Sequence, residues 1–128
     1  MATPTDEGIL FRLNTDVSLD RVINGVTIPN GMSWTLDNKY MYFTDSPSGS
    51  IKVYPFNADT GEISLSESKV FFTAEKGVPD GHCQDEEGYL WVANHGAGRV
   101  WRVSPQGEVV AEIELPTRCK WLEQACCR

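Results

Sequence analysis

The sequence contains an internal repeat, and this repeat restricts the folds available to the chain more than any other feature. Asn30-Gly31 stands 50 residues before Asp80-Gly81, and the same succession of short apolar segments follows each pair. Self-similarity at such a period is typical of repeat architectures, because each repeat is one unit that buries its apolar face against its neighbours. One structural unit is therefore predicted to occur twice.

The segments within each repeat are predicted to be β-strands. They are short and rich in β-branched and aromatic residues, and they are separated by Gly, Asn, Asp or Pro turns. We expect strands at residues 8–13, 18–25, 32–36, 40–45, 50–56, 63–72, 82–86, 89–94, 99–103 and 108–115.

Each full repeat reads as a four-stranded antiparallel meander of roughly fifty residues, which is the unit of a β-propeller blade. The segments at 8–13 and 18–25 match the last two strands of the unit, so about two and a half blades are expected. Propellers usually close with roughly four to eight blades. We therefore expect an all-β fragment with exposed strand edges, a partial propeller over residues 1–118 with a divergent tail at 119–128.

Charge and composition exclude several classes of protein. The 18 acidic and 11 basic residues give a net charge of −7, spread along the chain, which disfavours binding to nucleic acid. No apolar stretch approaches a membrane span, and the first residues lack a signal-peptide pattern, so a cytoplasmic protein without membrane contact is expected. The 4 cysteines form no zinc-binding pattern and are expected to be free thiols.

The repeat places Asn30 and Asp80 at equivalent positions, where the chain enters the innermost strand of a blade. Pro-Asn-Gly and Pro-Asp-Gly are common turn sequences, so either motif alone is best explained as a turn. Their equivalence favours a shared function. Carboxamide and carboxylate oxygens are hard ligands suited to Ca²⁺, Mg²⁺ or Mn²⁺, with Zn²⁺ as an alternative. Both residues are candidate metal ligands, and Asp80 is a candidate catalytic residue for proton transfer.

Four further side chains are weaker candidates. Asp45 and Asn94 occupy corresponding strand ends and would line the channel, contact a substrate or cap the adjoining turn. His82 and His95 are candidate bases, although a lone histidine in a loop is more often a satisfied surface group. His95 ranks above His82 because it stands beside Asn94.

Two segments, at 28–64 and 77–117, resemble the senescence marker protein-30/gluconolactonase family, which includes regucalcin and sugar lactonases. The resemblance implies a six-bladed propeller with one divalent metal ion (Ca²⁺, Zn²⁺, Mn²⁺ or Mg²⁺) in its central channel. It implies that a glutamate, an asparagine and an aspartate hold the metal. Asn30 and Asp80 match the asparagine and the aspartate, and the glutamate would belong to a first blade that lies outside this sequence.

The same resemblance implies hydrolysis of a small sugar lactone, with Asp80 also acting as general base. Two of the three implied ligands are present, and most of the implied substrate contacts lie upstream. The sequence therefore leaves two interpretations open. One is a lactonase-like hydrolase with an incomplete active site. The other is a non-catalytic propeller fragment that acts as an oligomerising or interaction module through exposed strand edges.

Overall fold

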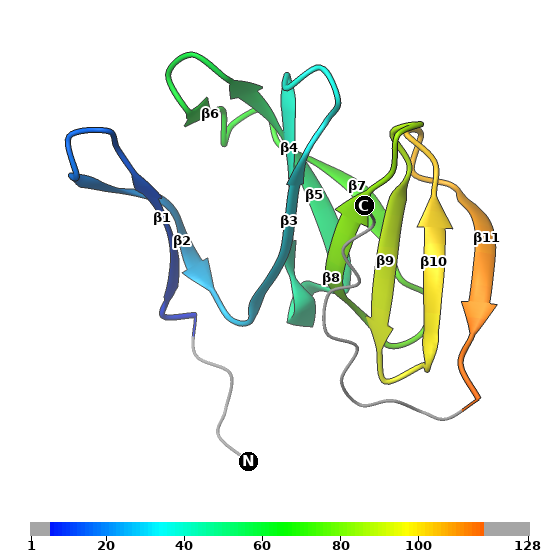
Figure 1. Cartoon of the computed structure of the whole chain (residues 1–128). Helices are drawn as coiled ribbons and strands as arrows, with labels where there is room; N and C mark the ends of the chain where they lie inside the picture. The colour runs from blue at the N-terminus through cyan, green and yellow to red at the C-terminus, as the bar shows by residue number, and fades with distance from the viewer. Residues whose placement is uncertain (1–5, 117–128) are drawn as a thin grey trace.

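The computed structural model describes residues 6–116, and nearly all of its regular structure is β-strand (Figure 1). The expected tail at 119–128 lies outside these residues. No helix in the described part of the chain is long and apolar enough to cross a membrane. The elements are β1 (Gly8–Leu13), β2 (Leu19–Val26), β3 (Pro29–Trp34), β4 (Tyr40–Asp45), the short 3₁₀ helix η1 (Ser46–Ser48), β5 (Ser50–Asn57), β6 (Glu62–Ile63), β7 (Lys69–Thr73), β8 (Val78–Gln84), β9 (Leu90–His95), β10 (Arg99–Val103) and β11 (Val109–Glu114).

The strands form three antiparallel sheets that lie side by side, in the order of the sequence (Figure 1). The first sheet is the hairpin β1-β2, the second has the order β3-β4-β5-β7 with β6 also paired to β5, and the third has the order β8-β9-β10-β11. The predicted all-β architecture, with two full repeats and a preceding half, is confirmed. One expected strand, 63–72, is divided into β6 and β7, because the backbone N–H of Ser68 bonds to the carbonyl of Leu65 in a serine-rich turn.

The hydrophobic core lies between neighbouring sheets rather than within one of them. Successive residues of β4 point to opposite faces, so Met41 and Phe43 pack toward the first sheet while Tyr42 packs toward the third. The second sheet is therefore buried on both faces, as the middle layer of a stack must be. The core between the second and third sheets consists of Tyr42, Ile51, Phe72, Leu90, Val92, Trp101 and Val103.

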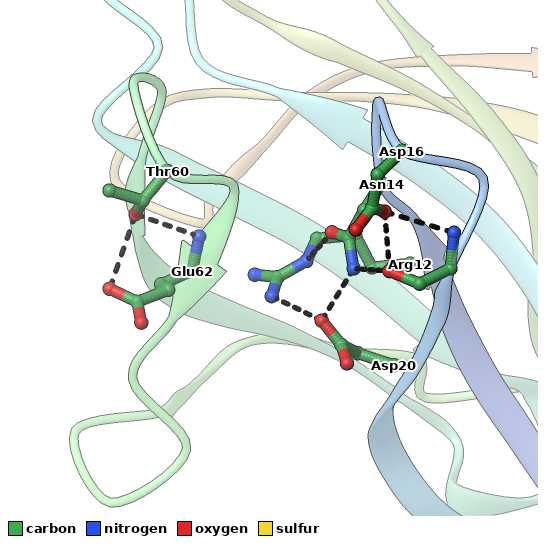
Figure 2. Close-up of polar contacts among 7 residues, drawn as sticks. Arg12, Asn14, Asp16, Asp20, Thr60 and Glu62 are labelled. Carbon is green, nitrogen blue, oxygen red and sulfur yellow. Dashed lines mark hydrogen bonds and ion pairs between the residues drawn. The ribbon is translucent and has the colours of Figure 1, made fainter.

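Polar contacts join the two strands of the first hairpin beside its turn. Arg12 forms an ion pair with Asp20 at 2.7 Å, and the Asn14 amide donates to the same carboxylate at 2.8 Å. Figure 2 shows that the Arg12 guanidinium points away from its own turn and toward the β5–β6 hairpin, which carries Thr60 and Glu62. The first sheet packs on the second through Leu10 and Ile23, which lie against the buried cluster that contains Met41, Phe43 and Tyr54.

Candidate functional site

Asn30 lies in a β-bulge near the start of β3, the innermost strand of the second sheet. Pro29 pairs with Asp45 of β4, and the next pair along the ladder joins Met32 to Phe43, so β3 carries one residue more than β4. Such a bulge leaves a residue unpaired and turns its side chain away from the regular alternation. The Asn30-Gly31 pair therefore stands out of the ladder at one end of the sheet.

Asp80 occupies the same position in β8, the innermost strand of the third sheet. Pro79 pairs with Asn94, and the next pair joins His82 to Val92, which reproduces the one-residue bulge. The predicted equivalence of Asn30 and Asp80 is thus an equivalence of backbone geometry as well as of sequence.

Gly31 allows the two bulges to touch. A Cβ on Gly31 would overlap the ring of His82 and would lie 2.8 Å from the carbonyl oxygen of Asp80. Any residue with a side chain would push these backbones apart, so the glycine is required by the close approach. The structure therefore brings Asn30 and Asp80 onto neighbouring strands, which run in the same direction in Figure 1.

A hydrogen-bond chain through Ser46 links the two motifs. The Asn30 amide nitrogen donates to Ser46 Oγ at 3.2 Å, and Ser46 Oγ donates to the Pro79 carbonyl at 2.8 Å. This arrangement leaves Asn30 Oδ1 as the atom of the amide that can accept or ligate. Ser46 is not among the residues predicted from the sequence. Its position directly after Asp45, a strand-end candidate, was the available signal.

Asn30 and Asp80 offer the oxygen atoms that a hard divalent cation prefers, but fewer of them than such a cation usually binds. Asp80 is half-buried, and no hydrogen bond or ion pair to its carboxylate is found within residues 6–116. Asn30 Oδ1 and the Asp80 carboxylate are therefore two oxygen donors on adjacent strands. Residues 6–116 contain no group of three or more His, Cys, Asp or Glu side chains that could hold a metal. A metal ion at this position would find two protein oxygen ligands among the described residues, and its other ligands would have to come from water, substrate or other residues.

Asp45 and Asn94 hold the segments that lead into the innermost strands. The Asp45 carboxylate accepts hydrogen bonds from the backbone N–H groups of Thr27, at 3.1 Å, and Ile28, at 2.8 Å. The Asn94 amide, which is fully buried, donates to the Lys76 carbonyl at 2.7 Å. Both side chains therefore bond to backbone groups, as capping residues do. These groups lie in the connection that precedes β3 or β8, rather than in the turn that follows Asp45 or Asn94. A role for either residue in binding substrate stays a prediction.

The two histidines lie in different environments. His82 is 4% exposed, its Nδ1 lies 3.3 Å from Thr44 Oγ1, and its Nε2 is buried without a hydrogen-bond partner among the described residues. Burial lowers the pKa of His82 to about 4, so the ring is neutral at pH 7. The interpretation of His82 as a surface group is wrong, because Gly31 of the adjacent strand covers its ring. His95 is exposed at the end of β9.

Two cavities, of about 510 and about 590 Å³, open between neighbouring sheets. The first lies against β2 and β5, and the second lies between β7 and the β10–β11 hairpin. Neither is lined by Asn30 or Asp80, so these cavities are separate from the candidate site.

The sequence matches a known family over nearly its whole length. Residues 1–127 match the family model described as SMP-30/Gluconolactonase/LRE-like region. The chain is 38% identical over 111 residues to regucalcin of Sus scrofa, and this match covers 86% of the chain and 37% of that protein. The chain thus spans about two fifths of the length of the curated relatives that it matches.

Solved structures give the same result for the fold. A calcium-binding protein, regucalcin, from Agrobacterium tumefaciens superimposes with a TM-score of 0.80 at 28% identity, covering 89% of this chain and 39% of that one. A gluconolactonase from Xanthomonas campestris superimposes with a TM-score of 0.72 at 27% identity, covering 86% of this chain and 35% of that one. The three sheets therefore correspond to part of the propeller found in these proteins.

Proposed function

Because the chain belongs to the SMP-30/gluconolactonase/LRE-like family, we propose that its sheets form part of a metal-dependent hydrolase that opens small sugar lactones. One observation supports this proposal above the others. Two equivalent β-bulges, in contact through Gly31, bring Asn30 and Asp80 onto neighbouring strands. Bulges are frequent beside active sites, where they redirect a side chain.

In this proposal Asn30 Oδ1 and the Asp80 carboxylate are two of the ligands of one divalent ion, with Ca²⁺, Mn²⁺, Mg²⁺ and Zn²⁺ as candidates. A bound ion of this kind polarises an ester carbonyl and lowers the pKa of a coordinated water. The hydrogen bond from Asn30 to Ser46 fixes the amide, so that its oxygen rather than its nitrogen is available to the ion.

Asp80 also performs the proton transfers. Its carboxylate takes a proton from the attacking water as the water oxygen bonds to the lactone carbonyl carbon. When the bond between that carbon and the ring oxygen breaks, Asp80 returns the proton to the departing oxygen. The product is an open-chain hydroxy acid, and the aspartate ends in its starting state. Asp80 carries no competing hydrogen bond within the described residues, which leaves the carboxylate available for this role.

A second candidate function, that of a non-catalytic propeller module, is supported by the small number of metal ligands that the described residues offer. The described residues offer two oxygen donors and no group of three ionisable metal ligands, whereas Ca²⁺ usually takes about six to eight oxygens. A chain that binds metal weakly and does not hydrolyse lactones would act as a non-catalytic propeller module.

One set of measurements tests both candidates. Titration calorimetry with Mn²⁺ and Ca²⁺ should detect binding to the native chain, and Asp80→Asn and Asn30→Ala should each weaken it at least about tenfold. Asp59→Asn, which changes an exposed aspartate in the β5–β6 turn, is the control and should bind as the native chain does. Opening of an aldonolactone is followed in parallel by acid release.

Activity that depends on metal and on Asp80 supports the hydrolase. Metal binding without lactone opening supports the non-catalytic module. The site assignment fails if the native chain binds neither ion or if Asp80→Asn binds them unchanged.

A further inference from the structure

The third sheet carries apolar side chains on its outer face at positions that are buried in the second sheet. Val100 pairs with Ile113 in the third sheet, and Ile51 pairs with Phe72 at the corresponding register of the second. Ile51 is 0% exposed and Phe72 is 6% exposed, because the third sheet covers them, whereas Ile113 is 48% exposed. The outer face of the third sheet is defined here by Val100 and Ile113.

The first sheet carries the complementary pattern. Leu13 precedes the β1–β2 turn as Val103 precedes the β10–β11 turn, and the same two backbone hydrogen bonds close both turns. Leu13 and Phe11 therefore correspond to Val103 and Trp101. The latter pair is 0% and 5% exposed, whereas Leu13 and Phe11 are 67% and 48% exposed. Arg12, between them, points toward the second sheet in Figure 2, so Phe11 and Leu13 lie on the opposite, outer face of the first sheet.

Inside the chain, the faces that correspond to these two outer faces pack against each other. Ile51 and Phe72 of the second sheet form one hydrophobic core with Trp101 and Val103 of the third. The rings of Phe72 and Trp101 meet edge to face, with centroids 5.4 Å apart. Within residues 6–116, the outer faces of the third and first sheets therefore repeat the two halves of the interface between the second and third sheets, and no sheet of this region packs on either of them.

We propose that the outer face of the third sheet, Val100 and Ile113, binds the outer face of the first sheet, Phe11 and Leu13, of a second copy of this chain. Ile113 would take the place of Phe72, and Phe11 of the partner copy the place of Trp101. The contact is made face to face, like the packing between sheets within the chain, rather than by hydrogen bonding along strand edges. It does not depend on Asn30, Asp80 or a metal.

The two surfaces of this contact are different, so the association is heterologous. Each copy retains a free face after binding one partner, and assembly beyond two copies follows unless the arrangement closes into a ring. The association should also strengthen as salt is added, because the driving force is apolar while each copy carries a net charge of −7.

Sedimentation velocity of the 128-residue chain, from low to high micromolar concentration, provides the test. The native chain should show a mass above that of the monomer that rises with concentration. Ile113→Asp and Leu13→Asp each remove one face and should each weaken self-association at least about tenfold. Val70→Asp, at a residue that is 60% exposed on β7 and belongs to neither face, should associate like the native chain.

Mixing the two variants gives the decisive result. The Leu13→Asp chain retains an intact third-sheet face and the Ile113→Asp chain an intact first-sheet face, so an equimolar mixture should form a one-to-one complex that neither variant forms alone. Far-UV circular dichroism of each variant, compared with that of the native chain, checks that the variant is folded. The proposal is overturned if the native chain stays monomeric, if either variant self-associates like the native chain, or if the mixture stays monomeric.

Discussion

The ring of His82 occupies the space that a side chain on Gly31 would need. Gly31 belongs to the innermost strand of the second sheet, and His82 belongs to that of the third. Their contact is therefore the point at which the two repeats meet beside the candidate metal ligands. It couples the position of Asn30 to that of Asp80, each one or two residues away along its strand.

We expect Gly31→Ala to lower both stability and metal affinity. The new methyl group would overlap His82 and would lie 2.8 Å from the Asp80 carbonyl oxygen, and overpacking of this kind costs about 1–3 kcal/mol in the free energy of unfolding. Urea unfolding and Mn²⁺ titration measure the two effects.

The double variant Gly31→Ala with His82→Ala is the control for that contact. Removing the ring should make the alanine at position 31 less harmful, so the two losses in unfolding free energy should not add. Additive losses would show that the overlap with His82 is not what makes Gly31 necessary.

The stability of the chain should decrease as the pH falls from about 6.5 toward 4. Burial lowers the pKa of His82 to about 4 from an ordinary value of 6.5, so the unfolded chain binds a proton that the folded chain excludes. Between these two pH values the free energy of unfolding falls by about 1.4 kcal/mol per pH unit. The whole effect is about 3 kcal/mol.

His82→Met is the matched variant for this prediction, because Met32 occupies the corresponding position of β3. Urea unfolding at a series of pH values, in the presence of a chelator, should show the slope in the native chain and its loss in the variant. The pKa values of Asp16, Asp20 and Asp37 are lowered by hydrogen bonds from neighbouring groups, so these carboxylates also reduce stability below about pH 5. The slope that reports on His82 is therefore read between about pH 6.5 and 5. A variant that keeps the native slope would assign the effect to another group.

The repeat made most of the fold predictable, because it defines which strands correspond. The starts of the two innermost strands were predicted wrongly: β3 begins at Pro29 and β8 at Val78, whereas the sequence predicts strands at 32–36 and 82–86. The equivalence of Asn30 and Asp80 followed from the same repeat. The burial of His82 did not, because it depends on a glycine of the preceding repeat that packs on the ring. The role of Ser46 depends in the same way on a carbonyl of the next sheet. Contacts between repeats are set by the packing of sheets, which the period alone does not specify.

We expect Val17→Asn to stabilise the chain. Val17 is 79% exposed in the β1–β2 turn with a φ of 69°, a left-handed conformation that β-branched residues rarely adopt. Asparagine tolerates this conformation, and the chain already uses Asn38, with a φ of 56°, in the β3–β4 turn. Relief of the strain should add about 1 kcal/mol to the free energy of unfolding. The reverse change, Asn38→Val, is the matched control and should lower it by a similar amount. Equal stabilities of Val17→Asn and the native chain would argue against strain at this turn.

Ser46→Ala should affect stability and metal binding together. Ser46 is 6% exposed, and its hydroxyl both accepts from the Asn30 amide and donates to the Pro79 carbonyl. Its loss should lower the free energy of unfolding by about 1–3 kcal/mol, because buried partners are left unpaired. The freed Asn30 amide can then rotate, and loss of such an orienting contact weakens metal binding about 10–100-fold.

Ser46→Thr retains the hydroxyl and should recover part of both losses. Ser48→Ala is the control, because the exposed Ser48 hydroxyl bonds only to backbone groups of its own turn, donating to the carbonyls of Asp45 and Ser50 and accepting from the N–H of Ser50. It should leave Mn²⁺ affinity, measured by calorimetry, unchanged. If Ser46→Ala lowers stability while Mn²⁺ binds with native affinity, Ser46 joins the two sheets without orienting Asn30, and the amide must be held by another contact.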